Sequence, residues 1–188
     1  MAAKLDLTKK HAAEYVTPRV PTLVRIAPAQ YLAIFGKGKP GGPEFEAAVG
    51  ALYNVAFTIK MASKFAGKDY AVCKLEGLWP TWESWTLIIR TPDFITARER
   101  TAALATLAKR KKGPLVVKVE LVVIKEGLCV QMLHVGPYSE EPKTVAQMHE
   151  FVQSKGLTLH GEHHEIYLGD PRRVKPEKLK TILRLPVR

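Results

Sequence analysis

The chain has 188 residues, of which 46% are hydrophobic and 25% are charged, as expected for one globular domain or two small ones. This composition excludes a fibrous protein and argues against a disordered one. Lys and Arg number 29 against 18 Asp and Glu, so the formal net charge is +11 and nucleic acid stays among the candidate partners.

The sequence shows no sign of membrane insertion or export. The longest apolar runs, such as 121–124, are far too short to span a bilayer. Lysines and Asp6 interrupt any apolar stretch at the N-terminus, so no signal peptide is expected. Cys73 and Cys129 lie in apolar segments, away from any metal-ligand spacing. We therefore expect a reduced, cytoplasmic protein.

The first half of the chain predicts an N-terminal arm followed by strands and one long helix. Residues 1–21 form the arm, which is helical at 4–15 and ended by Pro18 and Pro21. A glycine- and proline-rich loop precedes the best helical pattern of the chain, at 44–64. Strands are expected at 22–35, as two strands around a turn at 27–29, and at 70–78 and 84–91, joined by a tryptophan-rich turn.

The second half predicts two helices and four more strands. A helix begins at Pro92 and ends before Gly113. A second helix runs from 139 or 140 to 155 and is closed by Gly156. The strands are expected at 115–124 and 128–135, as a hairpin around 125–127, and at 160–168 and 179–186.

The order strand, strand, glycine loop, helix, strand, strand occurs twice, at 22–91 and 116–187. Residues 30–38 (QYLAIFGKG) align with 130–138 (VQMLHVGPY). One half cannot bury both its helix and its sheet face alone. The sequence therefore predicts an α+β fold in a single domain, 1–188, made of two β-α-β-β modules related by a pseudo-twofold axis. The halves are 22–92 and 115–188, the helix at 93–114 links them, and a ligand groove lies between them.

Three segments carry a family resemblance: LEGLW at 75–79, EGLCVQMLHVGPYSEEPKT at 126–144, and GEHHEIYLGDPRRVKPEKLKTILRLPV at 161–187. They resemble the GyrI-like family, small-molecule-binding domains related to a bacterial gyrase inhibitor and to drug-sensing transcription activators. The resemblance covers nearly the whole chain. It implies the duplicated fold with a central groove, and ligands that are bulky, planar, hydrophobic and often cationic, held by aromatic walls and a buried glutamate.

Within this family, the combination of EGLW, GPY and HHEIYL also resembles proteins that hydrolyse cyclopropane-bearing, DNA-alkylating natural products. Those cyclopropanoid cyclopropyl hydrolases act as resistance factors. The resemblance therefore implies an enzyme of drug detoxification that needs no cofactor.

Glu165 is the central candidate residue. Strand alternation places His163, Glu165 and Tyr167 on one face and apolar residues on the other. A lone glutamate on a strand is usually a solvated edge residue. The tyrosine beside it and the repeat partner Glu76 favour a groove position instead. There, burial disfavours the charged carboxylate and strengthens it as a base, and the same charge attracts an organic cation.

Aromatic residues form a second group of candidates. Three tryptophans, Trp79, Trp82 and Trp85, fall within seven residues. Trp79 and Trp82 flank a proline in a turn, where stacking on a flat ligand explains them best. Trp85 alternates with apolar strand residues, which favours a core position over ligand contact. Tyr138, in a Gly-Pro-Tyr loop, either donates a hydrogen bond to a developing oxyanion or anchors the loop.

Other chemistries find less support. His134 is more typical of a core or edge histidine than of a catalyst. His163 and His164 lack a third ligand, so no metal site is expected. There is no GxSxG, P-loop or dinucleotide-binding motif. The basic runs at 109–112 and 172–175 indicate at most weak, salt-sensitive, sequence-blind association with nucleic acid, since no reading helix accompanies them.

We therefore predict a protein that binds hydrophobic aromatic small molecules and hydrolyses a cyclopropane conjugated to a dienone. Glu165 is the predicted base, Tyr138 or Tyr167 the hydrogen-bond donor, and Glu76 a secondary polar contact. Two alternatives stay open at this point: a non-catalytic receptor or sponge for aromatic cations, and an interaction protein that binds gyrase or DNA through its basic surface. No pattern indicates an oligomeric state.

Overall fold

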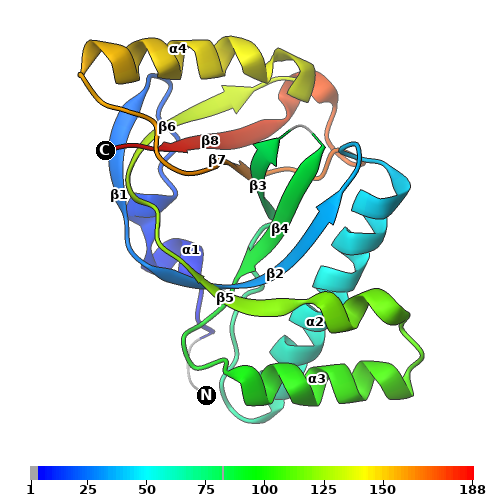
Figure 1. Cartoon of the computed structure of the whole chain (residues 1–188). Coiled ribbons are helices and arrows are strands. Elements are labelled where there is room, and N and C mark those ends of the chain that lie inside the picture. The colour runs from blue at the N-terminus through cyan, green and yellow to red at the C-terminus, as the bar shows by residue number, and fades with distance from the viewer. Residues whose placement is uncertain (1–3, 82) are drawn as a thin grey trace.

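The computed structural model describes residues 4–81 and 83–188, and over this part of the chain it is an α+β fold (Figure 1). Eight strands form one curled antiparallel sheet in the order β1-β6-β8-β7-β3-β4-β2-β5. The strands are β1 (Thr22–Ile26), β2 (Ala29–Lys37), β3 (Glu76–Thr81), β4 (Ser84–Arg90), β5 (Glu120–Ile124), β6 (Gly127–Val135), β7 (His163–Tyr167) and β8 (Lys180–Pro186).

The helical elements lie between these strands and at the N-terminus. The α-helices are α1 (Leu7–Lys10), α2 (Pro43–Phe65), α3 (Ala97–Lys109) and α4 (Glu141–Ser154). Short 3-10 segments are η1 (Ala12–Glu14), η2 (Pro114–Lys118), η3 (Tyr138–Glu140) and η4 (Pro176–Lys178). No helix in the described ranges is both long and apolar enough to cross a membrane.

Two four-stranded groups, β3-β4-β2-β5 and β7-β8-β6-β1, meet where β3 pairs with β7. The predicted hairpin of 115–124 and 128–135 is wrong. β5 pairs with β2, and β6 pairs with β1 and β8. Each group thus takes its outer strand from the other half of the sequence, which sequence patterning cannot reveal because pairing partners are set by tertiary packing. The internal duplication stays a prediction.

Several element boundaries also differ from expectation: for example, the strand predicted at 160–168 is shorter, at His163–Tyr167, and the helix predicted at 4–15 is divided into α1 and η1. The helix predicted from Pro92 begins at Ala97, because Thr96 caps it and Glu99 accepts a hydrogen bond from the Thr96 backbone N–H at 2.8 Å. The strand predicted at 70–78 begins at Glu76. The start of the strand predicted at 115–124 is the 3-10 segment η2.

Two of the helices, α2 and α4, cover the same face of the sheet. Residues directly opposite one another in register run across four strands as Leu87, Gly77, Glu165 and Leu183, so their side chains share that face. Helix α2 packs on the Leu87 end of this row and α4 on the Leu183 end, in two separate hydrophobic clusters. The middle of the row, at Gly77 and Glu165, lies at the seam between the clusters.

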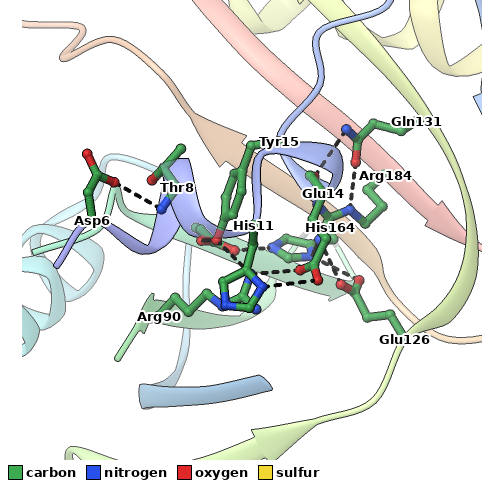
Figure 2. A network of polar contacts seen from close by, with 11 residues as sticks. Asp6, Thr8, His11, Glu14, Tyr15, Arg90, Glu126, Gln131, His164 and Arg184 are labelled. Atoms are coloured by element: carbon green, nitrogen blue, oxygen red, sulfur yellow. Dashed lines mark hydrogen bonds and ion pairs between the residues drawn. The ribbon is translucent and has the colours of Figure 1, made fainter. Parts of the chain in front are cut away.

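The opposite, inner face of the curled sheet holds a buried polar cluster closed by the N-terminal arm (Figure 2). His164 lies between two carboxylates, with Nε2 2.9 Å from Glu76 Oε2 and Nδ1 2.9 Å from Glu126 Oε1. Arg184 donates to Glu126 Oε2 at 2.8 Å and to the Glu14 carbonyl oxygen at 2.7 Å. The arm is therefore hydrogen-bonded directly to the sheet.

The arm also supplies charge to this cluster. Arg90 donates to Glu14 Oε2 at 2.7 Å, and the Tyr15 hydroxyl lies 3.4 Å from Glu76 Oε1. The cluster thus contains three carboxyl groups and three basic side chains. The carboxyl groups belong to Glu14, Glu76 and Glu126, and the basic side chains to Arg90, Arg184 and His164. Burial lowers the pKa of His164, but Glu126 and Glu76 outweigh it and raise that pKa to about 9. With His164 protonated, three carboxylates balance three cations.

Breaking this cluster is expected to be costly. Arg184 is only 2% exposed, and Arg184→Met leaves Glu126 buried without its guanidinium partner. We expect the free energy of unfolding, measured by urea denaturation, to fall by about 3–5 kcal/mol. Arg172→Met is the matched control. The Arg172 side chain is 79% exposed in its ion pair with Asp170, so the loss there should stay below about 1 kcal/mol. Equal losses would contradict this account of the cluster.

The stability should also depend on pH through His164. Its folded pKa is about 9, above the ordinary value of 6.5 that the unfolded chain has. The stabilisation is therefore fully present below pH 6.5 and is lost as the pH rises through 9, by up to about 3 kcal/mol. Urea denaturation at a series of pH values measures it. His164→Gln should flatten this part of the profile, whereas substitution of the exposed His149 should leave the slope intact.

Candidate functional site

A hydrogen-bonded chain of side chains lies at the seam between β3 and β7, on the face that carries the helices. The indole Nε1 of Trp79 donates to the Tyr167 hydroxyl oxygen at 3.2 Å. The Tyr167 hydroxyl in turn donates to Glu165 Oε2 at 2.8 Å, and His163 Nε2 lies 3.1 Å from Glu165 Oε1. The carboxylate of Glu165 is thus held at both oxygens by groups from its own strand.

The strand register explains why these residues meet. Trp79 lies opposite His163, and Gly77 lies opposite Glu165. A Cβ atom at position 77 would come within 2.9 Å of the Tyr167 hydroxyl and 3.0 Å of Trp79 Nε1. The absence of a side chain at Gly77 therefore makes room for the contact between the two rings.

A second carboxyl group, Glu141, faces Glu165 across the seam. It is the first residue of α4 and is buried, and its Oε1 has no hydrogen-bond partner among the described residues. Burial and the negative charge of Glu165 raise the pKa of Glu141 to about 8. At neutral pH Glu141 therefore keeps its proton.

Several aromatic rings pack against Trp79 and Tyr167, which are hydrogen-bonded in a chain to Glu165. Phe45 of α2 stacks on Trp79 with ring centroids 6.1 Å apart and an interplanar angle of 14°. Tyr138 packs edge-on against Tyr167 at 5.9 Å and 75°, and it is 39% exposed. Burial, together with the charges of Glu141 and Glu165, raises the pKa of Tyr138 to about 12. Its hydroxyl therefore stays protonated and able to donate.

The structure thus brings together five of the residues selected from the sequence: Glu165, Tyr167, His163, Trp79 and Tyr138. Sequence reasoning missed Glu141 and Phe45. Glu141 is an acidic residue in the first turn of a helix, and acidic residues are common there because of the helix dipole. Phe45 follows the apolar spacing of α2. Neither residue therefore carried a signal of its own.

The remaining described candidates lie away from the Glu165 side chain: Glu76, His134 and Trp85. Glu76 is opposite Ile166 in register, so its side chain points to the inner face, where it is fully buried against His164. The sequence repeat aligns Glu76 with Glu165, but the residue opposite Glu165 in the sheet is Gly77, and a step of one residue along a strand reverses the face. His134 is buried and joins Thr144 Oγ1 at 2.9 Å to the Pro137 carbonyl oxygen at 3.2 Å.

Trp85 is a core residue, as its alternation favoured. It is 3% exposed, and its Nε1 donates to the Gly38 carbonyl oxygen at 3.2 Å. Trp85 also borders a surface pocket of about 440 Å³ beside the N-terminus of α2, away from the carboxyl pair. Trp82 lies outside the described residues.

The geometry combines a carboxylate fixed by hydrogen bonds, a second carboxyl group that holds a proton, phenol donors and stacked rings. Such a site can bind a flat hydrophobic molecule and can both accept and donate protons. These features fit the class of small-molecule-binding proteins.

The comparisons agree with this class. The model of the GyrI-like small molecule binding domain matches residues 20–188, so the chain belongs to the GyrI-like family. A crystal structure of a hydrolase from Listeria innocua is 42% identical, covers 98% of this chain and 100% of its own, and superposes with a TM-score of 0.91. An uncharacterized conserved protein from Listeria innocua is 41% identical over 98% and 100% of the two chains, with the same TM-score.

A more distant structure shares the fold alone. The C-terminal domain of EcmrR is 13% identical over 89% of this chain and 96% of its own, with a TM-score of 0.59. No protein with a curated functional description matches the sequence significantly.

Filling the space at position 77 should disturb the site more than the fold. In Gly77→Ala the atoms nearest the new Cβ belong to the side chains of Tyr167 and Trp79, and none of them is a backbone atom. We expect affinity for a planar aromatic probe, followed by tryptophan fluorescence, to drop about tenfold, while the free energy of unfolding changes by no more than about 2 kcal/mol. Gly50→Ala, in open space on α2, is the control and should keep the affinity unchanged. Unaltered binding by Gly77→Ala would refute the role of the Trp79–Tyr167 contact.

Proposed function

We propose that the protein is a hydrolase that opens the activated cyclopropane of aromatic, DNA-alkylating cyclopropanoid compounds and so protects the cell from them. The observation that carries the proposal is the Glu165 carboxylate, fixed by Tyr167 at 2.8 Å and His163 at 3.1 Å inside an aromatic surrounding. The substrate class comes from the subgroup resemblance of the EGLW, GPY and HHEIYL segments. The hydrolase from Listeria innocua, at 42% identity, supports a hydrolytic reaction.

The reaction consumes one water molecule. Glu165 takes a proton from the water, whose oxygen forms a bond to the unsubstituted cyclopropane carbon. The carbon–carbon bond to the spiro centre breaks, and its electron pair passes into the dienone, which becomes an aromatic ring bearing an oxide. That oxygen then takes up a proton and becomes a phenol. Atoms and charge balance, and the gain of aromaticity drives the opening, so a positioned base and a donor suffice.

Of the two candidate donors, Tyr138 is better placed. The proton of the Tyr167 hydroxyl is already engaged by Glu165. The Tyr138 hydroxyl forms no hydrogen bond with the described residues, and the side chain is partly exposed, so it can reach a substrate carbonyl. Trp79, stacked on Phe45, offers an extended apolar wall for a planar substrate.

The test is turnover of a spirocyclopropyl-dienone alkylator, followed by mass spectrometry of the water adduct. We expect many turnovers by the wild type and a loss of about 10²–10⁴-fold in Glu165→Gln, which keeps the size of the side chain but removes the base. Glu162→Gln is the matched control, because Glu162 is exposed three residues earlier.

Two results would overturn the hydrolase. Tight binding without conversion would leave a drug-binding receptor. Binding that disappears with salt and ignores Glu165 would instead indicate a macromolecule-binding protein that uses its basic surface.

A further inference from the structure

The C-terminal half of α2 exposes a row of large apolar side chains. Phe57, Met61 and Phe65 are 52%, 41% and 82% exposed, and together they form the α2 stripe. They follow one another at intervals of four residues, so they share one side of the helix, and Tyr53 extends the row by stacking on Phe57 with ring centroids 5.9 Å apart. The buried residues of α2 lie on its other side, against the sheet (Figure 1).

A row of this kind calls for an explanation that a single exposed apolar residue does not. Isolated apolar side chains are ordinary on protein surfaces, whereas a contiguous apolar patch bordered by polar residues marks contact with another surface. Phe65 is the last residue of α2 and the most exposed large apolar residue of the described ranges. The α2 stripe is therefore an interaction surface.

Lysines accompany the α2 stripe. The chain from residue 47 to residue 68 contains three lysines, Lys60, Lys64 and Lys68, and no acidic residue. Lys60 is paired with Asp69 at 3.2 Å, whereas Lys64 is exposed and forms no ion pair with the described residues. Lys64 follows the first residue of the stripe by seven positions, which is two helical turns, and so lies on the same side of α2.

The N-terminal arm adds positive charge at the same end of the helix. The Leu5 N–H donates to the Asp69 carbonyl oxygen at 3.0 Å, and the Ala71 N–H donates to the Leu5 carbonyl oxygen at 2.7 Å. These bonds hold the neighbouring Lys4, which is exposed, near the end of α2. The surface thus combines apolar side chains with an excess of exposed lysines.

Charge and area argue against a second copy of the chain as the occupant of this surface. Each copy carries the same lysines and a net charge of +11, so two copies repel one another. A large side chain offers roughly 200 Å², so the exposed fractions of the stripe amount to roughly 350 Å² per copy. A standard protein interface buries about 800 Å² on each partner.

An anionic lipid surface satisfies both properties. The boundary between headgroups and acyl chains accepts aromatic and apolar side chains without a complementary shape, which suits the convex side of a helix. Negatively charged headgroups attract lysines placed beside those side chains. Charge complementarity therefore favours a membrane surface over a second copy.

We propose that the α2 stripe docks the protein on an anionic membrane surface. The three apolar side chains enter the boundary between headgroups and acyl chains, and the exposed lysines Lys4, Lys64 and Lys68 contact the headgroups. The helix lies on the membrane and does not span it. Phe45, which stacks on Trp79 in the candidate site, is twenty residues before Phe65, about 30 Å along the helix, so the site stays outside the lipid. The inference goes beyond the proposed hydrolase and does not depend on it.

The experiment measures cosedimentation of the protein with vesicles in about 0.1 M NaCl. One set of vesicles is phosphatidylcholine alone, and the other contains about one third phosphatidylglycerol. We expect the wild type to bind the anionic vesicles at least about tenfold more tightly than the neutral ones. Binding should weaken as the salt concentration rises, because salt screens the lysines.

Two pairs of variants separate the apolar and the charged contributions. Phe65→Ser should weaken binding to the anionic vesicles about tenfold. Phe35→Ser is its matched control, because Phe35 is 58% exposed but lies beside the N-terminal end of α2. Lys64→Glu should also weaken binding about tenfold and reduce its salt dependence. Lys111→Glu, at an exposed position just after α3, should have little effect.

A second readout reports lipid contact directly. Cys73 and Cys129 are buried, so Phe65→Cys provides an accessible thiol for a polarity-sensitive fluorescent dye. We expect the emission of the dye to shift to shorter wavelength when anionic vesicles are added, because the dye enters an apolar surrounding. The same dye attached to Phe35→Cys should show no shift. Attraction by net charge alone moves neither signal.

Three results would overturn the membrane site. The first is a wild type that does not bind the anionic vesicles. The second is equal binding by Phe65→Ser and Phe35→Ser without a dye shift, which would indicate adsorption through net charge alone. The third is a wild-type dimer, detected by sedimentation velocity, that Phe65→Ser abolishes while vesicles are not bound. That result would make the α2 stripe a contact between two copies of the chain.

Discussion

The pairing of β3 with β7 is the constraint on which the rest of the structure depends. It joins the two four-stranded groups into one sheet, and it fixes Gly77 opposite Glu165 and Trp79 opposite His163. A shift of one residue would turn Glu165 to the inner face and bring the Glu76 side chain to the helix-covered face. The site therefore exists only in this register.

Strand β7 carries two polar clusters back to back. His164 faces inward and is held by Glu76 and Glu126, while Glu165 faces outward beside Tyr167. Replacing a buried ion cluster with apolar residues often leaves stability unchanged, so such a cluster is better understood as a device that selects one arrangement. Here the arrangement selected is the register that presents Glu165. The N-terminal arm completes the cluster and is therefore linked, through strand β7, to the position of Glu165.

The chemistry of the site follows from what surrounds each carboxyl group. Hydrogen bonds fix both oxygens of Glu165, while burial and the charge of the nearby Glu165 raise the pKa of Glu141 to about 8, so Glu141 is neutral at pH 7. Aromatic rings from α2, β3, β7 and η3 adjoin Glu165 through Trp79 and Tyr167. Two glutamates of one site thus differ in what surrounds them, and perturbed carboxyl groups of this kind are common in functional sites.

The sequence by itself determined the family, the helix α2 and the alternation that sets His163, Glu165 and Tyr167 on one face, because these depend on local periodicity and short motifs. The tertiary structure decided which strands pair, so the expected hairpin around 125–127 was replaced by pairing of β5 with β2 and β6 with β1. It also decided that Glu76 faces inward and that Glu141 joins Glu165. Pairing partners, facing and burial arise from contacts between segments distant in sequence, and no local pattern encodes them.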